Sequence, residues 1–483
     1  MIKEEEKIIE QIRRLENESQ SLEIDKDERE VLLKKVNDYT ESFLNTLPQQ
    51  KAYEKKGYEK DKRDDDIQIK NGTNEIQDVL DLLEERIDKT GLNPASGGHL
   101  GYIPGGGIYA SALGDYIAAI TNRYAGVFYA SPGAVRIENA LINWMGKLIG
   151  YTDNFGGNLT SGGSFANLIA IATARSAGKI KSKNLESTVI YVCQQAHHSI
   201  LKALKITGME ECIIRIIELD DHFRMNIDKL QLQIDIDKKE GLHPFLLLGN
   251  AGSTDVGAVD PLYEMAAIAK ENDLWFHVDA AYGGFFLLTK EGREKMKGIE
   301  LADSVIMDPH KGLFIPYGLG IVMVKNVQHL LAANNFDANY MQDTKSQENE
   351  YSPSQLSPEL SKHFRGLRMW LPLKLHGEKP FAASLEEKIL LTRYFYEKIK
   401  LLGFKTGPFP DLSIIIFWFE PKEGDANDYN KMILKKIQND GRVFISSTLI
   451  KNQFLLRFAA LSFRTHIEHV DLLLSQLKDC IKE

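Results

Sequence analysis

The sequence lacks the features of disulfide-bonded, metal-binding and membrane-spanning proteins. Only three cysteines, Cys193, Cys212 and Cys480, occur in 483 residues, and their spacing suits neither a disulfide framework nor a metal-binding pair. The N-terminus is charged where a signal peptide is apolar, and no apolar run approaches the roughly 20 residues that span a bilayer. We therefore expect a soluble protein in a reducing, cytoplasmic compartment.

A basic excess is also missing. The chain has 59 Lys and Arg residues against 68 Asp and Glu residues, a formal net charge of −9, whereas nucleic-acid-binding proteins usually carry a basic footprint. Hydrophobic residues make up 43% and charged residues 26% of the chain, as in ordinary globular proteins. We expect binding to neither nucleic acid nor membranes, and the length favours two or three domains.

Three regions of different character follow one another. Residues 1–95 are charge-rich with helical spacing of their apolar side chains, which predicts a helical N-terminal segment. Residues 96–370 alternate short apolar runs with amphipathic stretches, which predicts a large α/β domain with a mainly parallel sheet. Residues 371–483 suggest a small α+β domain. The predicted strands of the large domain are 188–193, 212–217, 245–248, 274–279, 304–308 and 319–324.

Two motifs follow neighbouring apolar runs: HVDAAY at 277–282 and DPHKG at 308–312. Ligands of parallel sheets bind at the carboxyl ends of the strands. A lysine amine forms a Schiff base with the aldehyde of pyridoxal 5'-phosphate (PLP), and a carboxylate keeps the pyridine nitrogen protonated so that the ring accepts electrons. Asp279 and Lys311 are therefore candidates for a PLP site, although each alone could be a structural aspartate or a surface lysine.

Further predicted strand ends carry residues that suit the same cofactor. A glycine-rich stretch, 156–163, leads into Ser164 and a helical pattern, and backbone N–H groups at a helix N-terminus bind phosphate. Ser164 could instead simply cap that helix. His197 and Thr254 each follow an apolar run, where the histidine suits a pyridine ring or plain packing. Residues that suit PLP follow five predicted strands, and we do not expect this arrangement to arise by chance.

This constellation resembles the PLP-dependent group II decarboxylases, the family of the aromatic-amino-acid, histidine and glutamate decarboxylases. The similarity runs from about residue 27 to the C-terminus, so residues 1–26 look like an extra extension. The aspartate and lysine motifs are its most specific blocks, whereas the glycine-rich turn is unspecific. The further matching blocks are 99–104, 130–138, 160–164, 195–197, 364–370 and 456–458.

The resemblance implies the aspartate aminotransferase-like fold, fold type I, with a homodimer whose active sites lie at the subunit interface. Lys311 would carry the cofactor, Asp279 would pair with the pyridine nitrogen and His197 would stack on the ring. Ala281 would pack against the other ring face, and Thr254 would lie near the phenolic oxygen. The implied cofactor-binding set is Gly163, Ser164, His197, Thr254, Asp279, Ala281, His310 and Lys311, of which the first two and His310 would hold the phosphate.

The substrate side is less determined. The resemblance places Tyr102 and Pro104 at the substrate mouth and assigns protonation of the carbanion to a loop tyrosine, Tyr351 or, less well matched, Tyr340. The run at 105–107 is Gly-Gly-Gly, where aromatic decarboxylases tend to carry polar side chains, so the preferred amino acid stays open. An arginine near the 130–138 block, Arg136, could attract an acidic side chain or be a surface residue.

The implied activity is α-decarboxylation of an L-amino acid to its amine and carbon dioxide, so the partner is a small amino acid. Other PLP chemistries stay open, namely an aldehyde-forming oxidative decarboxylase, a carbon–carbon lyase and an aminotransferase. A non-enzymatic scaffold with a partner-recruiting N-terminus is a third reading, against which the intact Lys311 and Asp279 argue.

Overall fold

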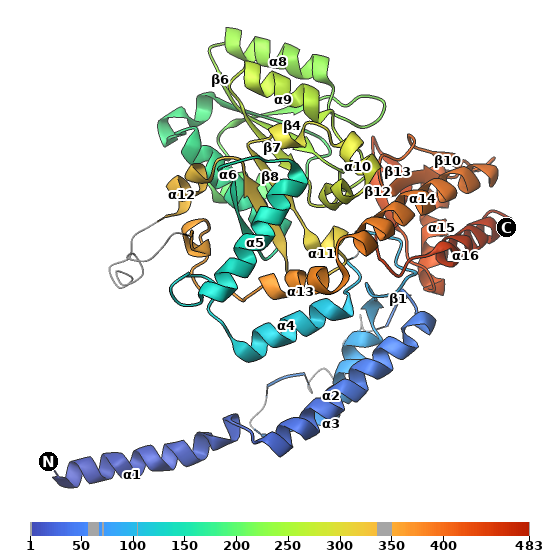
Figure 1. Ribbon diagram of the computed structural model, residues 1–483. Helices are drawn as coiled ribbons and strands as arrows, with labels where there is room; N and C mark the ends of the chain where they lie inside the picture. Colours follow the sequence, from blue (N-terminus) through green and yellow to red (C-terminus); the bar gives the residue numbers. More distant parts are fainter. Residues whose placement is uncertain (1, 57–66, 70–71, 104, 336–349, 483) are drawn as a thin grey trace. The chain divides into compact units, whose positions relative to one another are not determined.

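The computed structural model describes residues 2–56, 67–69, 72–103, 105–335 and 350–482 (Figure 1). The chain divides into two compact units, Met1–Asn93 and Pro94–Glu483. The predicted residue Pro104 and the alternative proton donor Tyr340 lie outside the described residues. Among the helices that the structure describes, none is both long and apolar enough to cross a membrane.

The first unit is helical, as its apolar spacing predicts. It contains α1 (Ile2–Ser19), α2 (Lys26–Thr46), α3 (Ile76–Leu83) with the π-helical turn η4 (Glu84–Asp88), and the short antiparallel strands β1 (Tyr53–Glu54) and β2 (Gly91–Leu92). The carboxylate of Asp25 caps α2 by accepting from the Glu28 N–H at 2.9 Å. The Tyr39 hydroxyl donates to Asp88 at 2.5 Å and so joins α2 to η4.

A seven-stranded sheet organises the second unit, in the order β3-β9-β8-β7-β6-β4-β5. Its strands are β3 (Gly156–Thr160), β4 (Thr188–Cys193), β5 (Ile213–Ile217), β6 (His243–Asn250), β7 (Trp275–Asp279), β8 (Ser304–Met307) and β9 (Gly320–Val324). The strands from β5 to β8 pair in parallel, whereas β9 and β3 pair antiparallel at one edge. The predicted mainly parallel sheet is confirmed.

Strand β3 was not expected, because its glycines read as a turn. A Cβ on Gly156 would lie 2.4 Å from Cγ2 of Val327, and one on Gly157 would lie 2.5 Å from the Val322 carbonyl oxygen. The strand therefore needs glycine for close packing against its neighbours. Because glycine is uncommon in strands, the sequence did not indicate a strand here.

Alternate side chains of the central strands face two different cores. Val189 and Tyr191 of β4 point into the core formed with α5, α8, α9 and α14, whereas Ile190 and Val192 point into the core formed with α6, α7 and α12. Helices therefore cover both faces of the sheet, as expected for near-continuous apolar strands. The helices are α4 (Tyr109–Thr121), α5 (Pro132–Ile149), α6 (Gly163–Ala177), α7 (Ser199–Ile206), α8 (Ile227–Lys239), α9 (Leu262–Glu271), α10 (Lys290–Lys295), α11 (Pro309–Gly312), α12 (Val327–Asn334), α13 (Gly366–His376) and α14 (Lys379–Leu401).

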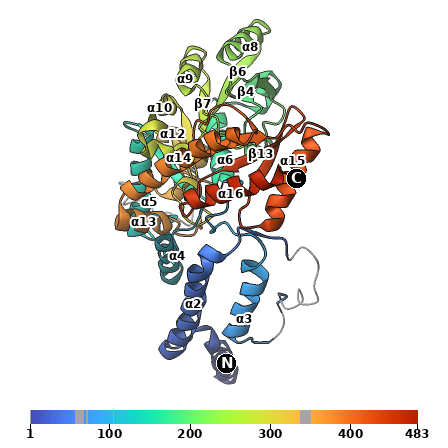
Figure 2. The ribbon, with the colours of Figure 1, turned by 90° about the vertical axis from the view of Figure 1, so that its right-hand side faces the viewer.

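A smaller antiparallel sheet ends the chain, in the order β10-β11-β13-β12. It consists of β10 (Lys405–Thr406), β11 (Ile414–Trp418), β12 (Ser446–Ile450) and β13 (Gln453–Ala459), with α15 (Ala426–Asp440) and α16 (Ile467–Cys480). Figure 2 shows α14 and α16 beside this sheet, where Phe395 stacks on Phe458 with ring centroids 4.3 Å apart. The α+β character was predicted, but β10 and β12 were not.

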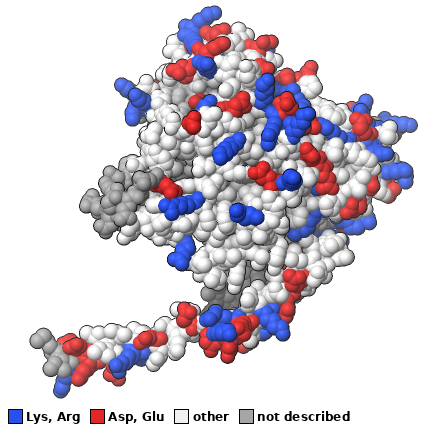
Figure 3. Space-filling view, in the orientation of Figure 1, with Lys and Arg blue, Asp and Glu red and all other residues white. Residues whose placement is uncertain are grey.

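On the described surface that faces the viewer in Figure 3, Lys and Arg side chains alternate with Asp and Glu side chains. This face carries no continuous basic area, in keeping with the acidic composition of the chain.

Candidate active site

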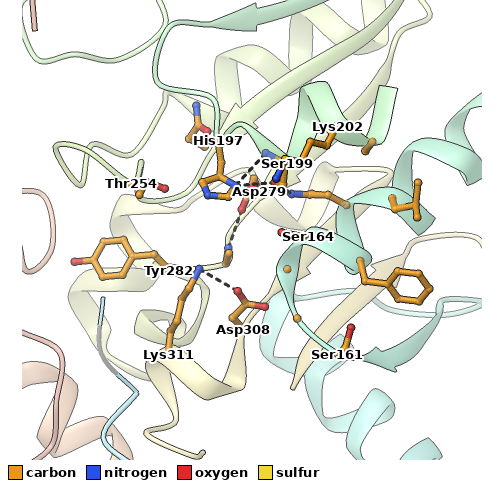
Figure 4. Close-up of a pocket in the computed structure, with 18 of the residues that line it drawn as sticks. Ser161, Ser164, His197, Ser199, Lys202, Thr254, Asp279, Tyr282, Asp308 and Lys311 are labelled. Carbon is orange, nitrogen blue, oxygen red and sulfur yellow. Dashed lines mark hydrogen bonds and ion pairs between the residues drawn. The ribbon is translucent and has the colours of Figure 1, made fainter. Parts of the chain in front are cut away.

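A cavity of about 470 Å³ lies at the carboxyl ends of the parallel strands, beside the N-terminus of α6 (Figure 4). It is lined by all eight residues of the predicted cofactor-binding set: Gly163, Ser164, His197, Thr254, Asp279, Ala281, His310 and Lys311. These residues come from loops and elements far apart in the sequence. The sheet therefore brings them together by placing its strand ends along one edge.

Lys311 projects into this cavity from the short helix α11, directly after β8. Proline at the first helical position suits the start of α11, and the Lys311 N–H donates to the Asp308 carbonyl oxygen at 2.9 Å. The Lys311 ammonium lies 3.0 Å from Oδ2 of the buried Asp308 carboxylate. The lysine side chain is thus held at a defined place before any ligand arrives.

Asp279 ends β7 and is buried at the cavity wall. Its Oδ1 accepts from the Ala281 N–H at 3.0 Å, and its Oδ2 accepts from Nδ2 of Asn167 at 2.9 Å. A carboxylate has further lone pairs, so each oxygen can still accept a hydrogen bond from a protonated ring nitrogen.

The carboxylate of Asp279 belongs to a longer buried network. Nδ2 of Asn167 also donates to Ser199 Oγ at 2.9 Å, and its Oδ1 lies 2.9 Å from Nε2 of His277. Because an amide oxygen only accepts, His277 must carry its proton on Nε2, and its Nδ1 then accepts from Ser304 Oγ at 2.8 Å. Burial lowers the pKa of His277 to about 4, so its ring is neutral near pH 7.

His197 connects to the same network. Its Nδ1 lies 2.7 Å from Ser199 Oγ and accepts from the Ser199 N–H at 3.2 Å. The neutral ring therefore carries its proton on Nε2, where it can be donated to a ligand. Burial lowers the pKa of His197, and the Asp279 carboxylate acts in the opposite direction. The ring centroids of His197 and His198 lie 4.0 Å apart.

The opposite end of the cavity is built from glycine and backbone N–H groups. Gly162 is the N-cap of α6, without a side-chain capping bond, so the reading of Ser164 as the helix cap is wrong. The first N–H groups of a helix have no partner within it and suit an anion. A Cβ on Gly163 would lie 2.7 Å from Oδ2 of Asp308, so a larger residue there would have to displace that carboxylate. His310 donates from Nδ1 to the Leu319 carbonyl oxygen at 2.5 Å, and burial lowers its pKa.

Arg457, for which the sequence assigned no role, holds together two loops, one of which carries the cavity residue Thr254. This buried guanidinium donates to the carbonyl oxygens of Thr254, Asp255 and Tyr102 at 2.6, 2.9 and 3.0 Å. Burial lowers its pKa to about 10. Arg457 thereby ties the loop that carries Thr254 to the loop that carries Tyr102, which itself is 57% exposed and does not line the cavity.

Two other predicted residues lie away from the cavity. The Tyr351 side chain is 43% exposed, and its hydroxyl accepts from Nε2 of Gln328 on α12 at 3.3 Å. Arg136 forms an ion pair of 2.8 Å with Glu350. Neither residue lines the cavity. The role of Tyr351 as a proton donor stays a prediction.

Sequence reasoning missed the residues that support the predicted ones. His277 lies two residues before Asp279 and so shares its side of β7, and Asn167 lies three residues after Ser164 and so shares its face of α6. These spacings could have drawn attention to both side chains. Nothing in the sequence around Arg457 indicates that it binds the carbonyl groups of residues that lie 202 and 203 positions earlier in the chain.

The donor set fits PLP group by group. Lys311 has an amine that would take the aldehyde, and Asp279 has a buried carboxylate that would face the pyridine nitrogen. The N-terminus of α6 presents backbone N–H groups at this end of the cavity, and such groups suit a phosphate.

Comparisons with known proteins agree with this chemistry. Residues 57–418 match the family model of the pyridoxal-dependent decarboxylase conserved domain. An aromatic-L-amino-acid decarboxylase of Bacillus atrophaeus is 33% identical over 392 residues, 80% of this chain and 81% of that protein. A phenylacetaldehyde synthase of Arabidopsis thaliana is 28% identical over 415 residues, 82% of this chain and 84% of that protein.

The fold agrees as well. The crystal structure of Oryza sativa TDC with PLP and tryptamine matches with a TM-score of 0.88 at 21% identity, over 95% of this chain and 99% of that chain. This likeness confirms the expected fold type I. The chain therefore belongs to the pyridoxal-dependent decarboxylase family and is a carboxy-lyase that uses PLP.

Proposed function

We propose that this enzyme removes the α-carboxylate of an aromatic L-amino acid as carbon dioxide and releases the corresponding amine. The observation that carries the proposal is the convergence of Lys311, Asp279 and His197 on one cavity. A buried network of neutral hydrogen-bonding groups holds the last two in place. Such fixed groups stabilise developing charge without having to reorganise during the reaction.

PLP, when bound, supplies the electron sink that accepts the electrons of the broken bond. Lys311 would hold the cofactor through its side-chain amine. Asp279 keeps a proton on the pyridine nitrogen, and the bonds from Ala281 and Asn167 keep its carboxylate oriented. His197 can donate its Nε2 proton to a carboxylate oxygen of the substrate and so orient the bond to be broken.

The proton that replaces carbon dioxide needs a donor at the α-carbon. We assign this step to Tyr351, which follows the segment 336–349 outside the described residues. Its hydroxyl bonds to Gln328, so the side chain has to leave that partner to reach the cavity.

The choice of an aromatic substrate rests on two supports. The 33% identical relative is an aromatic-L-amino-acid decarboxylase. Several cavity walls are apolar or aromatic, among them Phe165, Leu168, Ile206 and Tyr282. Arg136, the candidate for attracting an acidic side chain, is neutralised by Glu350 outside the cavity.

Amine formation has one specific competitor, oxidative decarboxylation to an aldehyde, which the 28% identity to a phenylacetaldehyde synthase raises. The test is the product balance of the PLP-loaded enzyme with each of the twenty amino acids. We expect one amine per carbon dioxide with aromatic substrates. Hydrogen peroxide with aldehyde would favour the oxidative route, and retained keto acid without carbon dioxide would favour an aminotransferase.

We also propose a cytoplasmic homodimer. Helix α4 exposes the apolar side chains of Leu113, Tyr116, Ile117 and Ile120, the last at 69%, and contiguous apolar surface often marks an interface. The three cysteines are free and buried, which suits a reducing compartment. Light scattering on the full chain should give twice the 54.6 kDa mass, whereas a single mass would contradict the dimer.

A further inference from the structure

Arg464 directs its charge at backbone carbonyl groups. Its guanidinium lies over the ring of Phe463, 4.3 Å from the ring centroid. Nη1 donates to the carbonyl oxygen of Gly106 and, at 3.4 Å, to that of Ala95. Burial lowers the pKa of Arg464, and no described carboxylate forms an ion pair with it. Hydrogen bonds from a charged donor are the stronger ones, so Arg464 holds these carbonyl groups firmly.

The carbonyl group of Gly106 belongs to the glycine run at 105–107. Gly106 and Gly107 have φ angles of +91° and +67°, which glycine adopts without strain. Successive glycines also have the most conformational freedom to lose, so the run keeps one conformation only where other groups hold it. Arg464 supplies such a group from a position 358 residues further along the chain.

The glycine run also packs against the segment that carries Lys311. A Cβ on Gly105 would lie 2.0 Å from the carbonyl oxygen of His310. The N–H of Ile108, directly after the run, donates to the carbonyl oxygen of Phe314 at 2.9 Å. The run is therefore held between the C-terminal segment and α11, whose Lys311 lines the cavity.

A second arginine holds the same stretch of chain nearer to its start. Arg457 donates to the carbonyl oxygen of Tyr102 at 3.0 Å, but it also bonds to the loop of Thr254, which lines the cavity. The carbonyl groups that Arg464 bonds, at positions 95 and 106, belong to residues that do not line the cavity. A substitution of Arg464 therefore tests the glycine run with the least disturbance of the cavity wall.

We infer that Arg464 is a positioning residue for substrate binding. By holding the carbonyl group of Gly106, it keeps the glycine run against α11 in the conformation that the substrate meets on its way to Lys311. Without Arg464 the run populates several conformations, and only the fraction in the competent one binds substrate, which raises the apparent dissociation constant. The inference rests on the proposed function, in which an amino acid reaches Lys311 past this run.

The first test is the steady-state kinetics of the PLP-loaded full chain with an aromatic amino acid. Arg464→Ala should raise KM about tenfold, as for the loss of a hydrogen bond from a charged group, while kcat stays within about twofold. Lysine keeps a charged donor, so Arg464→Lys should bring KM back to within about threefold of the wild-type value. Arg215→Ala, at a partly buried arginine that bonds to Asp237 instead, is the control and should leave KM unchanged.

Hydrogen–deuterium exchange gives a readout that does not depend on turnover. It is measured on the PLP-loaded full chain without substrate. The amide protons of residues 105–108 should exchange faster in Arg464→Ala than in wild type, because the run is no longer held in one conformation. In Arg215→Ala these protons should exchange as in wild type.

Other outcomes would overturn the inference. An unchanged KM in Arg464→Ala would show that substrate binding does not depend on this residue. A lower kcat with loss of bound PLP would show that Arg464 stabilises the cavity as a whole. Unchanged exchange at residues 105–108 would show that the run keeps its conformation without Arg464. A wild type that turns over no amino acid would instead refute the proposed function.

Discussion

The two sides of the cavity are built in different ways. On the cofactor side, Asp279, Asn167 and His277 come from β7 and α6, are buried, and have their polar atoms joined in one network. The residues that we propose for the substrate side, Tyr102, the run at 105–107 and Tyr351, lie on loops and do not line the cavity. We therefore propose that rigid elements position the chemistry, whereas loops select the substrate and deliver the proton.

The largest expected effect comes from removing the reactive amine on the cofactor side. Lys311→Ala should lower the rate of decarboxylation by roughly 10⁴-fold or more, the scale of losing a covalent catalytic group. It should also abolish the absorption band of covalently bound cofactor. Lys202→Ala, at another lysine of the cavity wall, is the matched control and should keep that band. Comparable activity of Lys311→Ala and wild type would contradict the assignment.

The buried network should make the cofactor side sensitive to acid. The pKa of His277 falls from its ordinary value of 6.5 to about 4 in the folded chain because of burial. Between these values the unfolded chain binds the proton more readily, so stability is lost as the pH falls from 6.5 to 4, by about 3 kcal/mol for this group. The melting temperature of wild type should therefore fall more steeply over this range than that of His277→Asn. Parallel curves would show that His277 is not the group responsible.

A smaller loss is expected from the amide that joins the network. Asn167→Ala leaves Asp279, Ser199 and His277 each without one hydrogen bond. Cofactor affinity or activity should fall about 10- to 100-fold, which is the usual loss when a group that orients a functional residue is removed. Asn158→Ala, at a buried asparagine that bonds to Pro353 instead, should destabilise the chain without this loss. Equal effects of the two variants would mean that Asn167 acts through stability alone.

A substitution in the glycine run at 105–107 tests the proposed substrate side. A Cβ on Gly105 would lie 2.0 Å from the carbonyl oxygen of His310, so Gly105→Ala must displace the backbone at this cavity residue or at position 105. We expect kcat/KM to fall about tenfold because the substrate is positioned less well. The cofactor should stay bound. Gly133→Ala on α5, where a Cβ meets nothing within 4 Å, should be silent. Loss of the cofactor in Gly105→Ala would mean that the two sides are not separable.

The smallest effect on substrate consumption is expected at Tyr351, where the product should change instead. Tyr351→Phe lacks the hydroxyl that would protonate the α-carbon, so less amine and more aldehyde should form per carbon dioxide. Tyr263→Phe, at an exposed tyrosine of α9, should leave the product ratio as in wild type. An unchanged amine yield in Tyr351→Phe would remove this residue from the mechanism.

The sequence predicted the cavity residues that directly follow a predicted strand. Lys311, Asp279, His197 and Thr254 each follow an apolar run, and the topology of a parallel sheet then brings them to one edge. The strands β10 and β12 were missed because the first is two residues long and the second carries polar side chains.

Partnerships between distant residues could not be predicted. Asn167 and Asp279 are 112 residues apart in the chain, and their bond depends on the packing of α6 against the sheet. Asp308 was read only as part of a motif, because a sequence does not show which buried oxygen lacks a partner. The family resemblance supplied roles for the motif residues, and the structure added the groups that orient them.

The most direct test of the central claim is to locate the cofactor on the protein. The PLP-loaded wild type is reduced with borohydride, digested, and mapped by mass spectrometry. We expect the reduced cofactor to be attached to Lys311. Attachment to another lysine, such as Lys202, or a complete absence of modified peptide, would contradict it.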